Sequence, residues 1–152
     1  MDQRNSEVQT VNEEGMQLVL LAFLRRYSYL ACMSYDLLFW RQRSEDTRLA
    51  KEIAHALSGG EQIFGLDHLP IERIMSRVND RFPLRVDGGL AYWDGGAAGM
   101  FELYHSVQYI HFCCRQLAAD HCNALVDIMS DFGCPLYDPQ VNQRFDGAST
   151  DT

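Results

Sequence analysis

The residues best suited to chemistry are histidines and cysteines between positions 105 and 122 of the chain. They are His105, His111, Cys113, His121 and Cys122. Imidazole nitrogens and thiolates are ligands that zinc prefers, and a thiolate beside a base can act as a nucleophile. Side chains alternate between the faces of a strand, so His111 and Cys113 would point the same way on a strand over residues 109–115. With His105 joining from the preceding strand, a small metal-binding or enzymatic domain is one hypothesis.

A packing role explains the same residues more simply. Cysteine is among the residue types most often buried, and Cys113, Cys114 and Cys122 fit as small apolar side chains. The interior of a strand is a poor place for an exposed nucleophile. The sequence also has no GxSxG, HExxH or nucleotide-binding motif. We therefore predict no catalytic residue, no metal ligand and no cofactor, and keep the metal-binding or enzymatic domain as the alternative.

Carboxylates offer a second kind of chemistry, because paired acids can act as general acid and base. Asp36 with Glu102 and Asp87 with Asp94 are the pairs that the sequence suggests. Nothing in the sequence brings either pair together. Asp87 and Asp94 each begin an Asp-Gly-Gly run, which is typical of turns between strands.

Aromatic and acidic residues near these turns are our candidates for a partner-binding surface. Tyr92 and Trp93 lie immediately before the second Asp-Gly-Gly run, and aromatic side chains anchor many protein interfaces. We predict that Asp87, Tyr92, Trp93 and Asp94 contact a partner protein. The acidic side chains would mimic a charged substrate or steer a basic partner toward the complex. Core packing is the competing explanation for each aromatic residue.

The element that must position these residues is a strand over Met33–Arg41. Tyr35, Leu37 and Phe39 would lie on one face, and Leu38 and Trp40 on the other with Asp36. Because both faces are largely apolar, we expect this strand to be central in a sheet and covered on both sides.

The remaining pattern alternates between helices and strands. Apolar residues recur at helical spacing over 44–57, 70–82 and 116–132, and short strands are expected at 90–93, 100–105, 109–115 and 134–137. This order predicts an α+β domain with an antiparallel or mixed sheet of four to five strands and helices packed on one face. A ferredoxin-like variant is the leading topology.

Three regions follow from the same pattern. Residues 1–32 read as an N-terminal extension, partly disordered or a single helix, residues 33–141 as the α+β domain and residues 142–152 as a flexible tail. An apolar run at residues 16–24 is too short to cross a bilayer as a helix, so we predict no membrane association.

Composition narrows the partners. The chain has 152 residues, of which 47% are hydrophobic, and a formal net charge of −8. Such an acidic chain argues against a nucleic-acid partner, which would need a clustered basic face. Five cysteines without a disulfide or zinc pattern are typical of a reducing cytoplasm. Self-association as a homo-oligomer stays open.

Two runs resemble a group of small bacterial proteins. Met33 to Trp40, Met-Ser-Tyr-Asp-Leu-Leu-Phe-Trp, resembles their N-terminal strand. Gly133 to Gln140, Gly-Cys-Pro-Leu-Tyr-Asp-Pro-Gln, resembles their C-terminal end, where a helix is followed by a strand closing in Tyr-Asp-Pro-Gln. The resemblance covers Met33 to about Phe145 and leaves residues 1–32 outside.

Some members of this group are similar to immunity proteins, which neutralise toxins that bacteria deliver to one another. The resemblance implies a small acidic domain that binds one cognate protein toxin, and it assigns no catalytic residue because both motifs are structural. We therefore expect an immunity-type binding protein in the cytoplasm whose toxin presents a basic surface.

Overall fold

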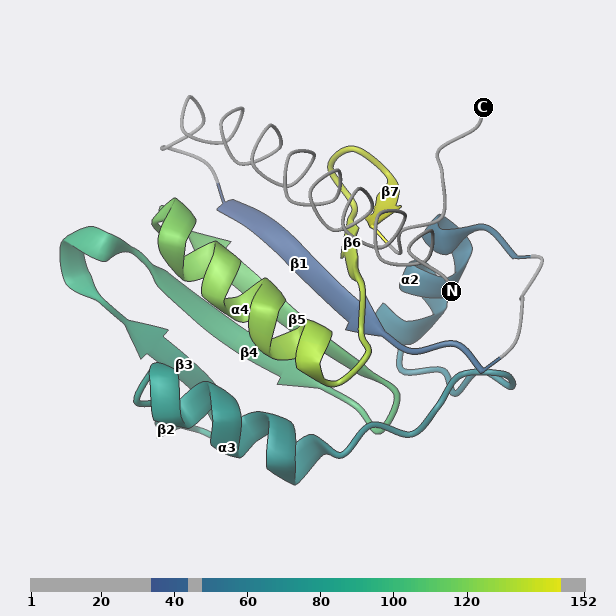
Figure 1. The fold of residues 1–152 in the computed structure, drawn as a ribbon, viewed down its shortest axis with the longest axis horizontal. Helices are drawn as coiled ribbons and strands as arrows, with labels where there is room; N and C mark the ends of the chain where they lie inside the picture. The colour runs from purple at the N-terminus through teal and green to yellow at the C-terminus, as the bar shows by residue number, and fades with distance from the viewer. Residues whose placement is uncertain (1–33, 44–47, 146–152) are drawn as a thin grey trace, which may run out of the picture. The chain divides into compact units, whose positions relative to one another are not determined.

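The computed structural model describes residues 34–43 and 48–145 of the chain. They form one antiparallel sheet in the order β2-β3-β4-β5-β1-β6-β7, with three α-helices (Figure 1). The strands are β1 (Ser34–Trp40), β2 (Arg85–Asp87), β3 (Leu90–Asp94), β4 (Met100–His105), β5 (Tyr109–Arg115), β6 (Leu136–Asp138) and β7 (Gln143–Phe145). The helices are α2 (Ala50–Ser58), α3 (Ile71–Arg81), α4 (Ala119–Asp131) and the short 3-10 helix η1 (Gly96–Ala98).

Strand β1 is central, as its two apolar faces predict. It pairs along its whole length with β5 and, at its end, with β6. Phe39 and Trp40 point to opposite faces of the sheet, and both are fully buried. Apolar cover is therefore needed on both sides of this strand.

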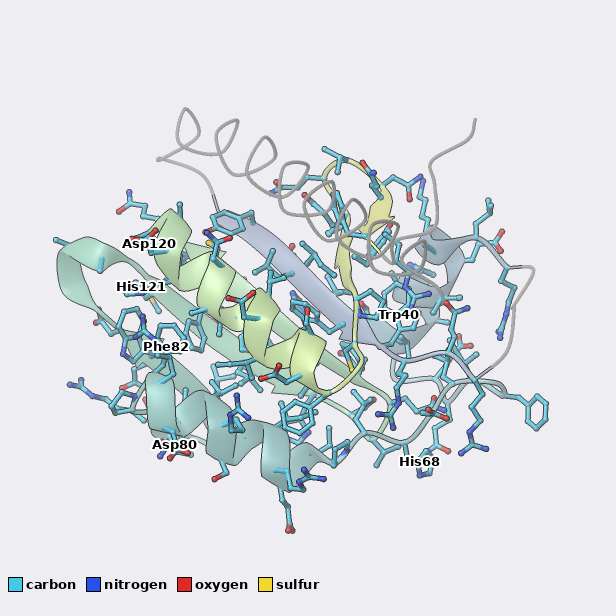
Figure 2. The ribbon with its side chains drawn as sticks, in the orientation of Figure 1. Trp40, His68, Asp80, Phe82, Asp120 and His121 are labelled. Atoms are coloured by element: carbon cyan, nitrogen blue, oxygen red, sulfur yellow. The ribbon has the colours of Figure 1, made fainter. Side chains whose placement is uncertain are left out.

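Helices α3 and α4 lie side by side across one face of the sheet (Figure 1). Phe82, the residue that ends α3, meets Phe101 of β4 edge to face, with ring centroids 5.4 Å apart. It also meets His121 of α4 at 5.4 Å (Figure 2). Offset and edge-to-face ring contacts of this kind add to the stabilisation from burial alone. This aromatic cluster fixes both helices on the sheet.

Helix α2 packs on the opposite face, so the prediction that all helices lie on one face is wrong. Its buried residues Ile53 and Leu57 join a core cluster with Leu38 and Trp40 of β1 and with Tyr137 of β6. The physical reason lies in β1, whose second face is apolar only toward its end. One short helix is enough to cover that part of the sheet.

The topology confirms the α+β class and contains the expected ferredoxin-like order. Strands β6-β1-β5-β4 are adjacent in that order, with α3 between β1 and β4 in the chain and α4 between β5 and β6. This is the split β-α-β arrangement. Strands β2 and β3 extend one edge and β7 extends the other, which gives seven strands where four to five were expected.

The two strands missing from the sequence interpretation lie at the edges. All three residues of β2 are exposed, and those of β7 are half-buried, so neither strand has the apolar alternation that marks a strand in a sequence. Strand β7 lies within residues 142–152, which were expected to be a flexible tail. The predicted extension, residues 1–32, and tail residues 146–152 lie outside the described residues.

The first Asp-Gly-Gly run forms a tight turn between β2 and β3, as expected. Asp87 pairs with Leu90, and Gly88 and Gly89 between them have φ values of 55° and 85°. A two-residue hairpin loop with two positive φ angles suits glycine best, since other residues are strained there.

Within the part of the chain that the structure describes, no helix has the length and apolarity needed to cross a membrane.

Candidate partner-binding face

Half of one sheet face has no helix on it among the described residues. Helix α2 covers the face at β1, at β6 and at Tyr109, the first residue of β5, whereas the same face of β2 to β4 and of the rest of β5 has no helix over it among the described residues. Strand register places ten polar and aromatic side chains on or beside this area, which we call the open face. They are Asp36, Arg85, Asp87, Tyr92, Asp94, Glu102, Tyr104, His111, Cys113 and Arg115.

Asp36 and His111 form the strongest contact on the open face. The imidazole Nε2 lies 2.8 Å from the Asp36 carboxylate, and the two side chains are 22% and 43% exposed. The hydrogen bond to His111 holds the pKa of Asp36 below its ordinary value, against the opposing effect of burial. The carboxylate is therefore ionised at neutral pH and fixes the orientation of the imidazole ring.

Cys113 lies between two carboxylates. It is opposite Asp36 on β1 and opposite Glu102 on β4. Burial raises the pKa of its thiol, and the negative charges of Asp36 and Glu102 raise it further. A protonated thiol is a poor nucleophile and a poor metal ligand, so this cysteine does not have the environment of a catalytic group.

Tyr104 completes the centre of the open face. Its hydroxyl donates a hydrogen bond of 3.0 Å to Glu102, and its ring lies 5.7 Å from that of His111, centroid to centroid. The bond to Glu102 raises the pKa of the Tyr104 hydroxyl, which stays protonated as a donor. The tyrosine remains 41% exposed, so a partner can contact it.

The expected grouping of His105 with His111 and Cys113 is wrong. His105 pairs with Ile110, whereas Tyr104 pairs with His111, so His105 points to the other face of the sheet. Tyr104, the residue before His105 in β4, lies beside His111 at the position that we expected for His105. Among the described residues no three histidine, cysteine or acidic side chains are placed to hold a metal ion.

The four predicted partner-binding residues divide between the two faces. Asp87, Tyr92 and Asp94 belong to the open face. Trp93 points the other way and packs against Phe82 with ring centroids 5.1 Å apart, at the edge of the core. Their binding of a partner stays a prediction.

The sequence interpretation counted Tyr104 among the aromatic residues of the chain but did not select it as a partner-binding residue, and it did not bring Asp36 and Glu102 together. Alternation along β4 and β5 was a usable signal, because it places Glu102 and Tyr104 on one face and His111 and Cys113 on one face. The register between strands, which joins the two sets, has no equivalent signal in the sequence.

A pocket of about 370 Å³ lies where the open face meets α2. Asp36 and His111 line it from the sheet, and Lys51 and His55 line it from the helix. Its other walls include Leu38, Ala54, Tyr137 and Pro139. The pocket thus combines apolar surface with one carboxylate, Asp36, and one ammonium group, Lys51.

Comparison with known proteins adds no family. No protein-family model, curated protein or solved structure matches the chain.

Proposed function

We propose that this protein is an immunity-type inhibitor, which binds one cognate protein toxin in the cytoplasm and neutralises it by direct association. The observation that carries the proposal is the open face, where exposed and half-buried tyrosines and carboxylates lie together on a rigid sheet without an activated nucleophile. Such a surface is suited to recognition. The resemblance of the β1 and β6 sequences to small bacterial proteins, some of them similar to immunity proteins, supports the same function.

The backbone beneath the open face is held on both sides. Strand β4 pairs with β3 and β5, and β5 pairs with β1. Tyr92 and Tyr104 therefore extend from fixed positions, and each has only two side-chain torsions to lose on binding. Rigid aromatic anchors of this kind often dominate the affinity of an interface.

The charges of the open face favour a basic partner. Asp36, Asp87, Asp94 and Glu102 supply four carboxylates, against the two guanidinium groups of Arg85 and Arg115. The whole chain carries a formal net charge of −8.

The test is coexpression of the chain with the product of the gene immediately upstream. We expect that product to stop growth when expressed alone, and we expect this chain to restore growth and copurify with it. Growth arrest that the chain does not relieve, with no complex formed, would contradict the proposal.

A matched pair of variants places the interface. Tyr92→Ala combined with Tyr104→Ala should weaken toxin binding by about 100-fold, because each truncation of a central aromatic anchor typically costs 1 kcal/mol or more. Phe64→Ala removes a phenylalanine that is 99% exposed in the loop between α2 and α3, outside the open face. It should leave affinity within about threefold, as contacts outside an interface do. The reverse ranking would place the interface elsewhere.

A further inference from the structure

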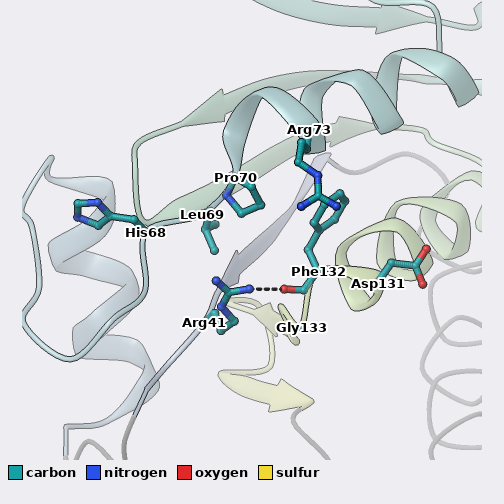
Figure 3. A pocket seen from close by; sticks show the side chains of 8 residues that line it. All are labelled: Arg41, His68, Leu69, Pro70, Arg73, Asp131, Phe132 and Gly133. Carbon is teal, nitrogen blue, oxygen red and sulfur yellow. Dashed lines mark hydrogen bonds between the residues drawn. The ribbon is translucent and has the colours of Figure 1, made fainter.

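A second site lies in an open pocket of about 660 Å³ near the start of α3 and the end of α4 (Figure 3). Its lining residues are Arg41, His68, Leu69, Pro70, Arg73, Asp131, Phe132 and Gly133. None of them belongs to the open face, so the pocket is separate from the proposed toxin-binding surface. Pockets of this volume commonly hold small organic molecules.

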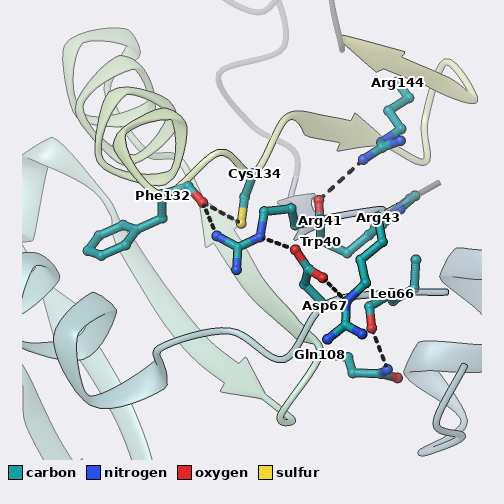
Figure 4. A network of polar contacts seen from close by, with 9 residues as sticks. All are labelled: Trp40, Arg41, Arg43, Leu66, Asp67, Gln108, Phe132, Cys134 and Arg144. Atoms are coloured by element: carbon teal, nitrogen blue, oxygen red, sulfur yellow. Dashed lines mark hydrogen bonds and ion pairs between the residues drawn. The ribbon is translucent and has the colours of Figure 1, made fainter. Parts of the chain in front are cut away.

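Arg41 is fixed in this pocket by two hydrogen bonds (Figure 4). Its Nε donates to the Asp67 carboxylate at 2.7 Å, and its Nη1 donates to the backbone carbonyl of Phe132 at 2.9 Å. Its Nη2 has no partner among the described residues. The guanidinium group is therefore oriented in advance, with one nitrogen left for a ligand.

Arg73 brings a second guanidinium group to the pocket. Its Cζ lies 5.7 Å from the centre of the Phe132 ring, a cation–π contact. Within residues 34–43 and 48–145 it has no hydrogen bond or ion pair, so all five of its N–H donors are available. Arg73 lies in the first turn of α3, where the helix dipole also favours negative charge.

Two aspartates near the pocket are already paired. Asp131 forms an ion pair of 2.8 Å with Arg77, and its carboxylate points away from the two guanidinium groups (Figure 3). Asp67 is shared by Arg41 and Arg43, which lower the pKa of its carboxyl group. Four arginines thus gather around two aspartates, an excess of positive charge in a chain whose net charge is negative.

We propose that this pocket binds the oxyanion group, phosphate or carboxylate, of a small organic molecule. Arg41 and Arg73 donate to the oxyanion, and Leu69, Pro70 and the Phe132 ring contact the apolar part of the molecule. Guanidinium groups match the geometry of both oxyanions, because two parallel N–H donors meet two oxygen atoms.

The test uses ¹H–¹⁵N NMR spectra of the full chain, titrated with phenyl phosphate against sodium chloride at equal ionic strength. We expect saturable shifts at the side-chain resonances of Arg41 and Arg73 and at the amides of the first turn of α3. Arg73→Gln should weaken binding about tenfold, the effect of losing one charge-assisted contact.

Arg81→Gln is the matched control. Arg81 lies on the same helix and also covers a phenylalanine, with its Cζ 4.7 Å from the centre of the Phe82 ring, but it does not line the pocket. It should leave affinity within about twofold, because it removes the same charge without a direct contact. Shifts that do not saturate, or equal weakening by both variants, would overturn the site.

Two further probes separate the parts of the ligand. Inorganic phosphate should bind several-fold more weakly than phenyl phosphate, because it cannot contact Leu69, Pro70 and Phe132. Equal affinities would overturn the apolar part of the proposal. Benzoate reports on the carboxylate: saturable binding by benzoate or by phenyl phosphate supports an oxyanion site, and binding by neither overturns it.

Discussion

At the scale of single residues, the open face depends on side chains whose neighbours control their protonation. Asp36 contacts His111 directly and lies opposite Cys113, so one carboxylate is the neighbour of both an imidazole and a thiol. It favours a fixed imidazole and a protonated thiol. The contacts of Asp36 with His111 and Cys113 therefore explain why this cluster has hydrogen-bonding capacity but no activated cysteine.

Asp36 should make stability depend on pH. Its pKa is lower in the folded protein than its ordinary value of 3.8, so its contribution is present above that value and is lost as the pH falls through the folded-state pKa. Because the side chain is 43% exposed, solvent screening limits this contribution. Asp36→Asn should therefore lower the free energy of unfolding by about 0.5–1 kcal/mol at pH 7.

Urea unfolding of both proteins between pH 2 and pH 7 measures this difference. The two free energies of unfolding should converge at the acidic end of the series, where the wild-type carboxyl is protonated. A difference that stays constant over the whole range would show that Asp36→Asn acts through packing alone.

The sequence named Asp36 and Glu102 as acids but could not show that they flank one cysteine. Asp36 and Cys113 are 77 positions apart, and only the pairing register of β1 with β5 makes them neighbours. A shift of one residue would turn every side chain of β1 to the other face. Register depends on the assembled core, which is why His105 was assigned to the wrong side.

At the scale of elements, long and strongly patterned segments were predictable. Strands β4 and β5 have the expected bounds, because apolar residues alternate along them and turn residues lie at their ends. The helix expected from residue 44 begins at Ala50, and residues 44–47 lie outside the described part. The side of the sheet that α2 covers was available in the two apolar faces of β1, yet the predicted architecture did not use it.

The loop between α2 and α3 is held in part by the side chain of Gln108, which lies between the strands expected at 100–105 and 109–115. Gln108 is 4% exposed, and its amide oxygen accepts a hydrogen bond of 2.7 Å from the Ile63 backbone N–H. Its amide nitrogen donates to the carbonyl oxygens of Ile63 at 2.8 Å and Leu66 at 3.3 Å. The Gln108 amide thus satisfies backbone groups of the loop that would pair with another strand in a sheet.

Gln108→Ala should lower the free energy of unfolding by about 2–4 kcal/mol, because the Ile63 N–H and the Leu66 carbonyl lose their partner, the Ile63 carbonyl keeps only its 3.4 Å bond from the Leu66 N–H, and a cavity remains. Chemical denaturation checks the value. Gln62→Ala, an exposed glutamine of the same loop, is the control and should change stability by less than about 0.5 kcal/mol. Similar losses in both variants would mean that the loop does not depend on the buried amide.

At the scale of the whole molecule, the fold separates charged residues into two regions of opposite character. The open face presents more carboxylates than guanidinium groups, whereas the pocket beside α3 gathers arginines. Net charge is a single value for the chain. It is consistent with the acidic open face, but it gives no sign of the arginines around the pocket. A basic site inside an acidic protein becomes visible only when the neighbours of each arginine are known.

If the partner is the proposed basic toxin, long-range attraction should accelerate its association with this chain. We expect the association rate constant to fall by about tenfold or more between 50 and 500 mM sodium chloride, because salt screens the attraction between opposite charges. Stopped-flow mixing measures it. Asp94→Asn combined with Glu102→Gln should reduce this salt dependence, and Glu72→Gln, on α3, should reduce it less. A rate constant independent of salt would show that charge does not guide the encounter.

The central position of β1 has a consequence for synthesis on the ribosome. Its main partner β5 follows it by about 70 to 80 residues, so β1 leaves the ribosome well before that strand exists. At elongation rates of about 5–20 residues per second the interval is on the order of 4–16 s. During that time both apolar faces of nascent β1 lack cover. The strand is therefore a natural binding site for a chaperone and the segment most exposed to aggregation.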